Sequence, residues 1–182
     1  MIHLKNSGFT PQDAKDLLSQ ADKLVSEMHA IVRDARVSRR YVEFDVSISK
    51  EYLDVLVKKM ETIGPLDHAR HLVEEEMEKE KAVEMGREYF NYERFWECHE
   101  ILEGVWKKTY EGEKDLVQGI ILVAAAFVHY QKNEDDICLS ILKRAMEKFG
   151  NSSGKYYDID VDVLQNKVSE IISSGKIETF TI

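Results

Sequence analysis

The hydrophobic residues of this chain are spaced in two ways, one typical of helices and one typical of strands. The first part contains both spacings, and the helical spacing prevails from about Glu74. Between residues 10 and 28 the apolar positions recur every three or four residues, which is the spacing of one face of a helix. Thr10 and Pro11 suit the cap and the first turn of that helix. Residues 41–48, YVEFDVSI, alternate strictly instead. This alternation predicts a half-buried strand, with an apolar face toward the core and a polar face that carries Glu43.

The other short apolar runs of the first part predict three more strands and one more helix. Ser49 can cap a helix that ends at Gly64-Pro65, because proline cannot continue a helix. The strands are expected in MIHL, HAIVRDARV and LDHARHLV, at residues 1–4, 29–37 and 66–73. The resulting order, βαββαβ, is the split βαβ pattern of ferredoxin-like folds. The connection VSRR is not a diagnostic hairpin turn, and without that hairpin a smaller α/β domain would remain.

From about Glu74 the chain follows a helical period and contains no proline. EEEMEKEKAVEMGREYF predicts a charged helix, and four more are expected near residues 93–108, 114–131, 136–149 and 160–173. Short connections favour antiparallel neighbours, hence an all-α helical bundle of about five helices. The predicted fold class is α+β, with a small ferredoxin-like domain at residues 1–75 and a helical-bundle domain at 76–182. The tail KIETFTI has strand-like residues and could pair with the N-terminal sheet.

Composition and charge narrow the classes of partner. The chain has 182 residues, of which 43% are hydrophobic and 32% charged, which argues against disorder. A net charge of -9 disfavours a general polyanion-binding role, and Asp34 interrupts the one basic cluster, VRDARVSRR. Nucleic acid is therefore not an expected partner, whereas a homo-oligomer and an unknown small-molecule ligand stay open.

Cys98 and Cys138 are the only cysteines and form no CxxC pair, which fits buried thiols in a reducing compartment. The longest apolar run, GIILVAAAFVHY, is too short to cross a bilayer, and no charged-then-apolar leader opens the chain. We therefore expect a cytoplasmic protein without membrane contact.

The stretch FWECHEILEGVW holds the candidate chemistry. On a helix, His99, Glu103 and Trp106 share one column along the border of the apolar stripe, because they are spaced four and three residues apart. Glu97 and Glu100 are expected to point broadly the other way.

The next predicted helix carries a matching column, in which Gln118 and His129 lie on one stripe. If the two helices fold back around Gly112, Gln118 comes level with Glu103, and the two side chains can form a hydrogen bond. His129 falls about six residues, or roughly 9 Å, farther along the axis, which makes it a peripheral member of the cluster.

Phe90-Asn91, FWECHEILEGVW and the later DLVQGIILVAAAFVHY together resemble a bacterial and archaeal family, the domain of unknown function 309. That family is similar in carrying F-N-x-x-x-Y/F-x-E-x-H-E-x-x-E-x-x-W and then Q-G-x-x-x-x-A-A-x-x-H in a helical bundle. The resemblance covers about residues 80–150, with mild departures at Trp96 and Cys98, and leaves the N-terminal part outside. It implies a suspected metal-binding role for the shared H-x-x-x-E-x-x-W element, within a family that has no established activity.

A metal site is one interpretation of the column. A histidine and a glutamate four residues apart can ligate one ion, as the two histidines of HExxH zinc helices do, and Glu100 stands where those enzymes keep their general base. Such a site would accept a divalent zinc, manganese or iron ion. The third ligand is not evident, and His129, His68 and His71 are the candidates to supply it.

Two other interpretations use the same residues. His99 could be a base oriented by Glu103 in a metal-free hydrolase or isomerase, although no serine or cysteine nucleophile is placed beside it. Alternatively the cluster is structural and, with Trp106 and Gln118, fixes the helix register. The predicted function is therefore a metal-binding, hydrolase-like site, against a non-catalytic ligand-sensing or oligomerisation module.

Overall fold

A computed structural model describes residues 1–71 and 77–182 of the protein. The chain divides into two compact units, one of Met1–Glu74 with Gln131–Asn133 and one of Glu75–Tyr130 with Glu134–Ile182. Each unit has a hydrophobic core of its own.

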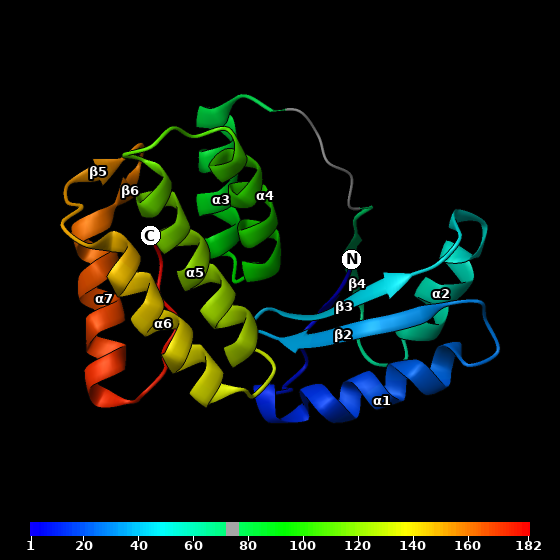
Figure 1. Ribbon diagram of the computed structural model, residues 1–182. Helices are drawn as coiled ribbons and strands as arrows, with labels where there is room; N and C mark the ends of the chain where they lie inside the picture. The colour runs from blue at the N-terminus through cyan, green and yellow to red at the C-terminus, as the bar shows by residue number, and fades with distance from the viewer. Residues whose placement is uncertain (72–76) are drawn as a thin grey trace. The chain divides into compact units, whose positions relative to one another are not determined.

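The first unit is a four-stranded antiparallel sheet with two helices (Figure 1). Its elements in chain order are β1 (Ile2–Lys5), a 3-10 turn (Pro11–Asp13) leading into α1 (Ala14–Val25), β2 (Ile31–Val37), β3 (Tyr41–Ser47), a 3-10 turn (Lys50–Tyr52) leading into α2 (Leu53–Met60), and β4 (Leu66–Ala69). The strand order is β2-β3-β1-β4, and every neighbouring pair is antiparallel. The predicted succession of strands and helices is therefore present in this unit.

Side chains close the turns that begin these elements. The backbone N–H and the hydroxyl of Thr10 donate to the Asp13 carboxylate at 2.7 and 2.9 Å, which fixes the turn ahead of α1. In the β2–β3 hairpin, Ser38 Oγ accepts the backbone N–H of Tyr41 at 2.8 Å and that of Arg40 at 3.2 Å. The hairpin thus forms without a glycine or asparagine turn because a serine hydroxyl satisfies its backbone donors.

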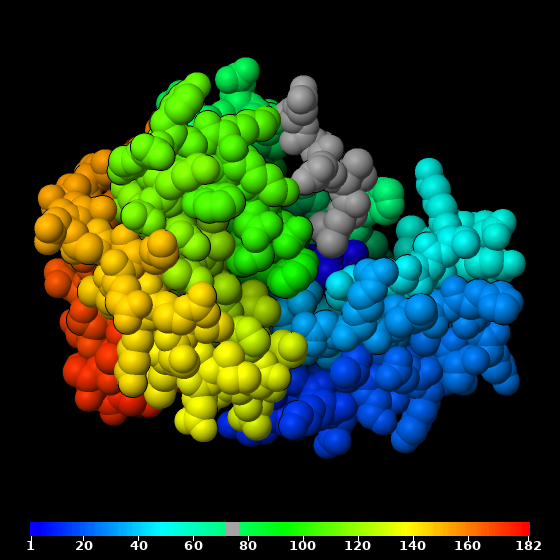
Figure 2. All heavy atoms as spheres, viewed as in Figure 1, coloured from blue at the N-terminus to red at the C-terminus, as the bar shows by residue number. Residues whose placement is uncertain are grey.

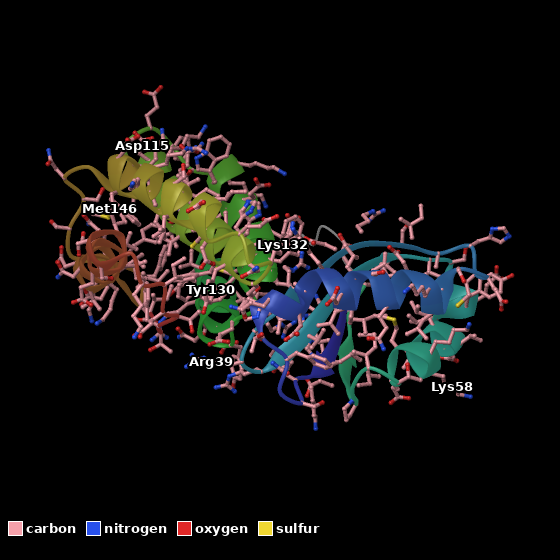
Figure 3. All side chains as sticks on the ribbon, turned by 90° about the horizontal axis from the view of Figure 1, so that it is seen from below. Arg39, Lys58, Asp115, Tyr130, Lys132 and Met146 are labelled. Carbon is pink, nitrogen blue, oxygen red and sulfur yellow. The ribbon has the colours of Figure 1, made fainter. Side chains whose placement is uncertain are left out.

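The sheet has one apolar face and one polar face. The apolar face packs on α1 and α2, and Figure 3 shows α1 lying across the strands. Its core residues include Ile2, Leu4, Val32, Ala35, Val37, Val42 and Phe44 from the strands and Leu17, Ala21, Leu56 and Met60 from the helices. The polar face was expected to meet solvent, but Glu43 there is only 1% exposed. That expectation is wrong, because the carboxylate lies in an ion-pair network on the sheet that allows its burial.

The second unit contains five helices (Figure 1). They are α3 (Lys79–Asn91), α4 (Phe95–Lys107), α5 (Lys114–Tyr130), α6 (Asp135–Phe149) and α7 (Val161–Ser174), with the short strands β5 (Lys155–Tyr156) and β6 (Ile159–Asp160) before α7. Each helix packs on the next, and Figure 2 shows α7, in orange to red, against α6, in yellow. None of the helices in the described part of the chain has the length and apolar character needed to span a bilayer.

The helices begin and end close to their predicted limits, since α4 to α7 follow the 3.6-residue period of the sequence. The charged helix begins later than expected, at Lys79, and the first residues predicted for it lie outside the described part. The predicted fourth strand likewise extends beyond that part, and β4 ends at Ala69. At Gly119 a Cβ atom would lie 2.7 Å from the Phe149 ring, so α5 and α6 approach closely because this residue has no side chain.

The C-terminal tail does not join the N-terminal sheet, so this expectation is wrong. Within residues 1–71 and 77–182 the four-stranded sheet consists of β1 to β4, and the segment after Gly175 forms no strand. Asn91 at the end of α3 binds the tail with both ends of its amide: Nδ2 donates to the Ile182 carbonyl at 3.0 Å, and Oδ1 accepts the Ile182 N–H at 2.7 Å. The Phe180 ring packs among Phe90 and Phe127. The apolar pattern of the tail therefore reflects burial on the helical unit.

Candidate functional site

The predicted column on α4 brings one histidine between two carboxylates. His99 Nε2 lies 3.7 Å from Glu103 Oε1, and His99 Nδ1 lies 3.3 Å from Glu100 Oε1. The imidazole stacks on the Trp96 ring with centroids 5.6 Å apart. The His99 side chain is 20% exposed, and those of Glu100 and Glu103 are 46% exposed, so the column borders solvent. One nitrogen and two carboxylates are thus placed where a cation could reach them.

The other predicted members of the cluster have different surroundings. Lys114 Nζ lies 4.8 Å above the Trp106 ring, and Trp106 Nε1 has no hydrogen-bond partner among the described residues. The predicted bond between Gln118 and Glu103 is absent from the hydrogen bonds of the described residues. Lys114 lies one turn before Gln118 on α5, so the side chain over Trp106 comes from the first turn of that helix.

His129 is paired within its own neighbourhood. Its Nδ1 lies 2.6 Å from Glu134 Oε2, just before α6 begins. The sequence predicted His129 to lie at the edge of the α4 cluster. Its contact with Glu134 instead links the end of α5 to the residue before α6. The structure therefore brings together His99, Glu100 and Glu103, and it does not add Gln118 or His129 to them.

Glu97 was expected to point broadly away from the His99 column, and its burial was not foreseen. It is 3% exposed, and Arg94 binds it with two donors: Nε donates to Oε2 at 2.6 Å and Nη2 donates to Oε1. The Arg94 guanidinium also lies 4.5 Å over the Tyr89 ring. A bidentate pair of this kind allows a carboxylate to be buried, and the local signal was the arginine three residues before the glutamate. Glu97 is also a residue whose carboxylate could ligate a metal ion.

The two cysteines are unsuited to nucleophilic chemistry. Burial raises the pKa of the Cys98 thiol far above its usual range. Burial, together with the Asp135 carboxylate, raises the pKa of Cys138 to about 12. Because the thiolate is the reactive form, both side chains act as small apolar residues, as predicted for Cys98.

A second cluster of ligand-type side chains lies on the polar face of the sheet. Arg36, Glu43, His3 and His68 are successive register partners across β2, β3, β1 and β4. Arg36 Nε lies 3.3 Å from Glu43 Oε2, and Arg36 Nη1 lies 3.1 Å from Asp34 Oδ2. Glu43 Oε1 lies 3.5 Å from His3 Nε2. His3, Arg36 and Glu43 are all buried, so this row is an internal polar network.

The two histidines of this row are stacked face to face. Their centroids are 4.1 Å apart with an interplanar angle of 11°, and each offers a ring nitrogen to a metal ion, within 4.8 Å of the other. The edge of Tyr41 packs on both rings, at centroid distances of 5.7 and 6.1 Å. His68 Nδ1 lies 2.8 Å from Asp67 Oδ2. The pair thus presents two imidazoles from neighbouring strands at a spacing that one ion can bridge.

Sequence reasoning named His68 and His71 only as extra ligands for the α4 column, and it did not single out His3. His68 lies beside His3 in the first unit, and His71 is exposed. Both His3 and His68 stand at polar positions of predicted strands, so alternation placed them on a polar face. Their meeting depends on the pairing of β1 with β4, which alternation alone does not reveal.

The two clusters suit different ions. The sheet offers two imidazole nitrogens, and imidazole suits zinc, copper, nickel and iron. The α4 column offers one imidazole and two exposed carboxylates, a harder set that also suits manganese. Structural zinc sites have four protein ligands and catalytic ones three, so either cluster would need further ligands, from protein or water.

The fold and these clusters define an α+β protein whose helical unit carries a histidine–glutamate column. Residues 83–141 of that unit match the family model described as domain of unknown function (DUF309). The matched stretch includes His99, Glu103, Trp106, Gln118 and His129, and it excludes the whole N-terminal sheet. The chain thus carries a DUF309 domain, and the family name states no activity. A comparison with curated proteins finds no match.

Proposed function

We propose that the protein binds a divalent transition-metal ion on its N-terminal sheet through ring nitrogens of His3 and His68. The observation that carries this proposal is the stacked pair, with ring nitrogens within 4.8 Å of each other on neighbouring strands. The backbone ladder fixes the spacing of ligands on paired strands, and the two stacked rings would only have to tilt for their in-plane lone pairs to meet at one ion. The His68 side chain is 30% exposed but its Nε2 atom is buried, so the ion would bind beneath the surface.

Metal titration of the full chain tests this function. Competition with a chromophoric chelator would measure the affinity for Zn²⁺, Ni²⁺ and Co²⁺, and the visible spectrum of bound Co²⁺ would report nitrogen ligands. We expect His68→Ala to weaken binding at least tenfold. His29→Ala, which removes an exposed histidine of the same unit, is the matched control and should change nothing. Equal affinity in both variants, or no binding by the natural sequence, would contradict the proposal.

A second candidate function belongs to α4. His99 and Glu103 would ligate a zinc, manganese or iron ion, and Glu100 would act as general base in a hydrolytic reaction. The distances of 3.7 and 3.3 Å from the imidazole to the two carboxylates support it, together with their exposure. Trp106, Gln118 and His129 would only border such a site. A His99→Ala, Glu103→Gln double variant should abolish manganese binding and leave binding by the sheet histidines unchanged.

The competing role is a non-catalytic sensing or assembly module. The strand order and the antiparallel pairing support the finer classification of the first unit as ferredoxin-like, a pattern that serves many functions. Ile31 at the start of edge strand β2 is 65% exposed, which favours a homo-oligomer through that edge. Light scattering after size exclusion would measure the mass, and a monomer at all concentrations would argue against assembly. Domain limits at residues 1–75 and 76–182 remain a prediction, which separate expression of both fragments would test.

A further inference from the structure

We infer that Asp67 sets the tautomer of His68 and so selects the nitrogen through which this ring binds its ion. This inference rests on the proposed metal site at His3 and His68. Asp67 lies on β4 with His68, and Glu43 lies on β3, the neighbour of β1 on its other side. Asp67 Oδ2 is 2.8 Å from His68 Nδ1, and Glu43 Oε1 is 3.5 Å from His3 Nε2.

Only the Asp67 contact has the length of a hydrogen bond. An ionised carboxylate only accepts hydrogen bonds, and a neutral imidazole carries one N–H and one lone pair. The proton of His68 therefore lies on Nδ1 and its lone pair on Nε2. A carboxylate behind a ligating histidine orients the ring and increases its basicity, an arrangement common around protein metals.

Glu43 is itself held in place from the edge of the sheet. Arg36 Nε contacts its second oxygen at 3.3 Å, and Arg36 Nη1 contacts Asp34 at 3.1 Å. The guanidinium balances the charge of the buried Glu43 carboxylate, so Oε1 can face His3. Asp34, Arg36, Glu43 and His3 thus form a chain of positioning groups that runs across three strands toward the ligand pair.

Long-range ¹H–¹⁵N correlation spectra of the histidine rings test the inference on the full chain. Without metal, we expect His68 as the Nδ1–H tautomer, the reverse of the form that free histidine prefers. With zinc, His68 Nε2 should show the shift of a metal-bound nitrogen. Asp67→Asn should return His68 to the Nε2–H form and weaken zinc binding by about 10–100-fold, as loss of such partners does elsewhere.

Matched variants separate positioning from general damage. Asp16→Asn changes an exposed carboxylate on α1 and should leave the His68 tautomer and the zinc affinity unchanged. Asp67→Glu restores a carboxylate and should recover part of the affinity. Zinc binding with His68 in the Nε2–H form would overturn this inference alone. A natural sequence that binds no ion would overturn both the inference and the proposed function.

Discussion

The sheet histidines and the α4 histidine are held in contrasting ways. His3 is fully buried on β1, and it contacts Glu43 and Tyr41 of β3 and His68 of β4. In the described part of the chain, the ring stack of His99 is with Trp96, and its two ion-pair contacts are with Glu100 and Glu103 of the same helix.

This difference bears on where a rigid site can form. A helical pair four residues apart is stabilised by only a few tenths of a kcal/mol and fluctuates in solvent. Register partners on paired strands are fixed by the backbone ladder on both sides. The recognisable motif therefore lies on the cluster that one helix supplies, and the cluster that three paired strands hold has no motif.

The largest effect is expected from Arg36→Ala on the sheet. Removing this guanidinium leaves the buried Glu43 carboxylate without its charge partner, which should lower the free energy of unfolding of the first unit by about 3–5 kcal/mol. Hydrogen exchange of β1 and β3, measured by mass spectrometry, is the suitable readout, because both tryptophans lie on α4.

The matched control for Arg36→Ala is an exposed ion pair. Lys148 Nζ lies 2.9 Å from Asp115 Oδ1 near the start of α5, where Figure 3 labels the aspartate. Lys148→Ala should cost no more than roughly 1 kcal/mol, as surface pairs do. If Arg36→Ala were equally mild, the sheet row would not be the rigid network that its burial indicates, and the contrast with α4 would disappear.

The next prediction concerns Glu97, which is buried, in contrast to the exposed Glu100 and Glu103 of the same motif. Arg94→Ala leaves Glu97 buried without its bidentate partner, and we expect a loss of roughly 2–3 kcal/mol in the helical unit. Urea unfolding followed by the fluorescence of Trp96 and Trp106 measures it directly. Lys108→Ala, at an exposed position directly after the same helix, serves for comparison and should shift the midpoint little. A small effect of Arg94→Ala would mean that Glu97 does not depend on its arginine and is open to another role.

Features of the fold that depend on neighbouring residues in the sequence could be predicted, and features that depend on contacts between distant segments could not. The limits of β3 and of α4 to α7 follow from local periodicity, so they were predicted to within a few residues. The pairing of His3 with His68 joins residues far apart in the chain and depends on strand order. The predicted apolar stripe of α4 is buried, whereas the burial of Glu97 depends on its pairing with Arg94, which helical periodicity does not reveal. The arginine before Glu97 was a local clue, whereas the His3 stack had none.

A smaller effect is expected at Asn91, which the motif places next to Phe90. Asn91→Ala removes both hydrogen bonds to the Ile182 backbone and should weaken tail docking by roughly 1–2 kcal/mol. Limited proteolysis should then cut the segment after Gly175 faster, and Asn166→Ala, at an exposed position of α7, should not change the rate. An unchanged rate in Asn91→Ala would show that Phe180 packing alone holds the tail.

The smallest effect is expected for His99→Ala, within about 0.5 kcal/mol, because the imidazole is partly exposed and its ion pairs lie on one helix. Urea unfolding of this variant beside Glu103→Gln provides the measurement. A loss above roughly 2 kcal/mol would favour the structural interpretation, in which the column fixes helix register. A negligible loss would argue against that structural interpretation. Manganese titration of the same two variants would then test whether these side chains bind an ion.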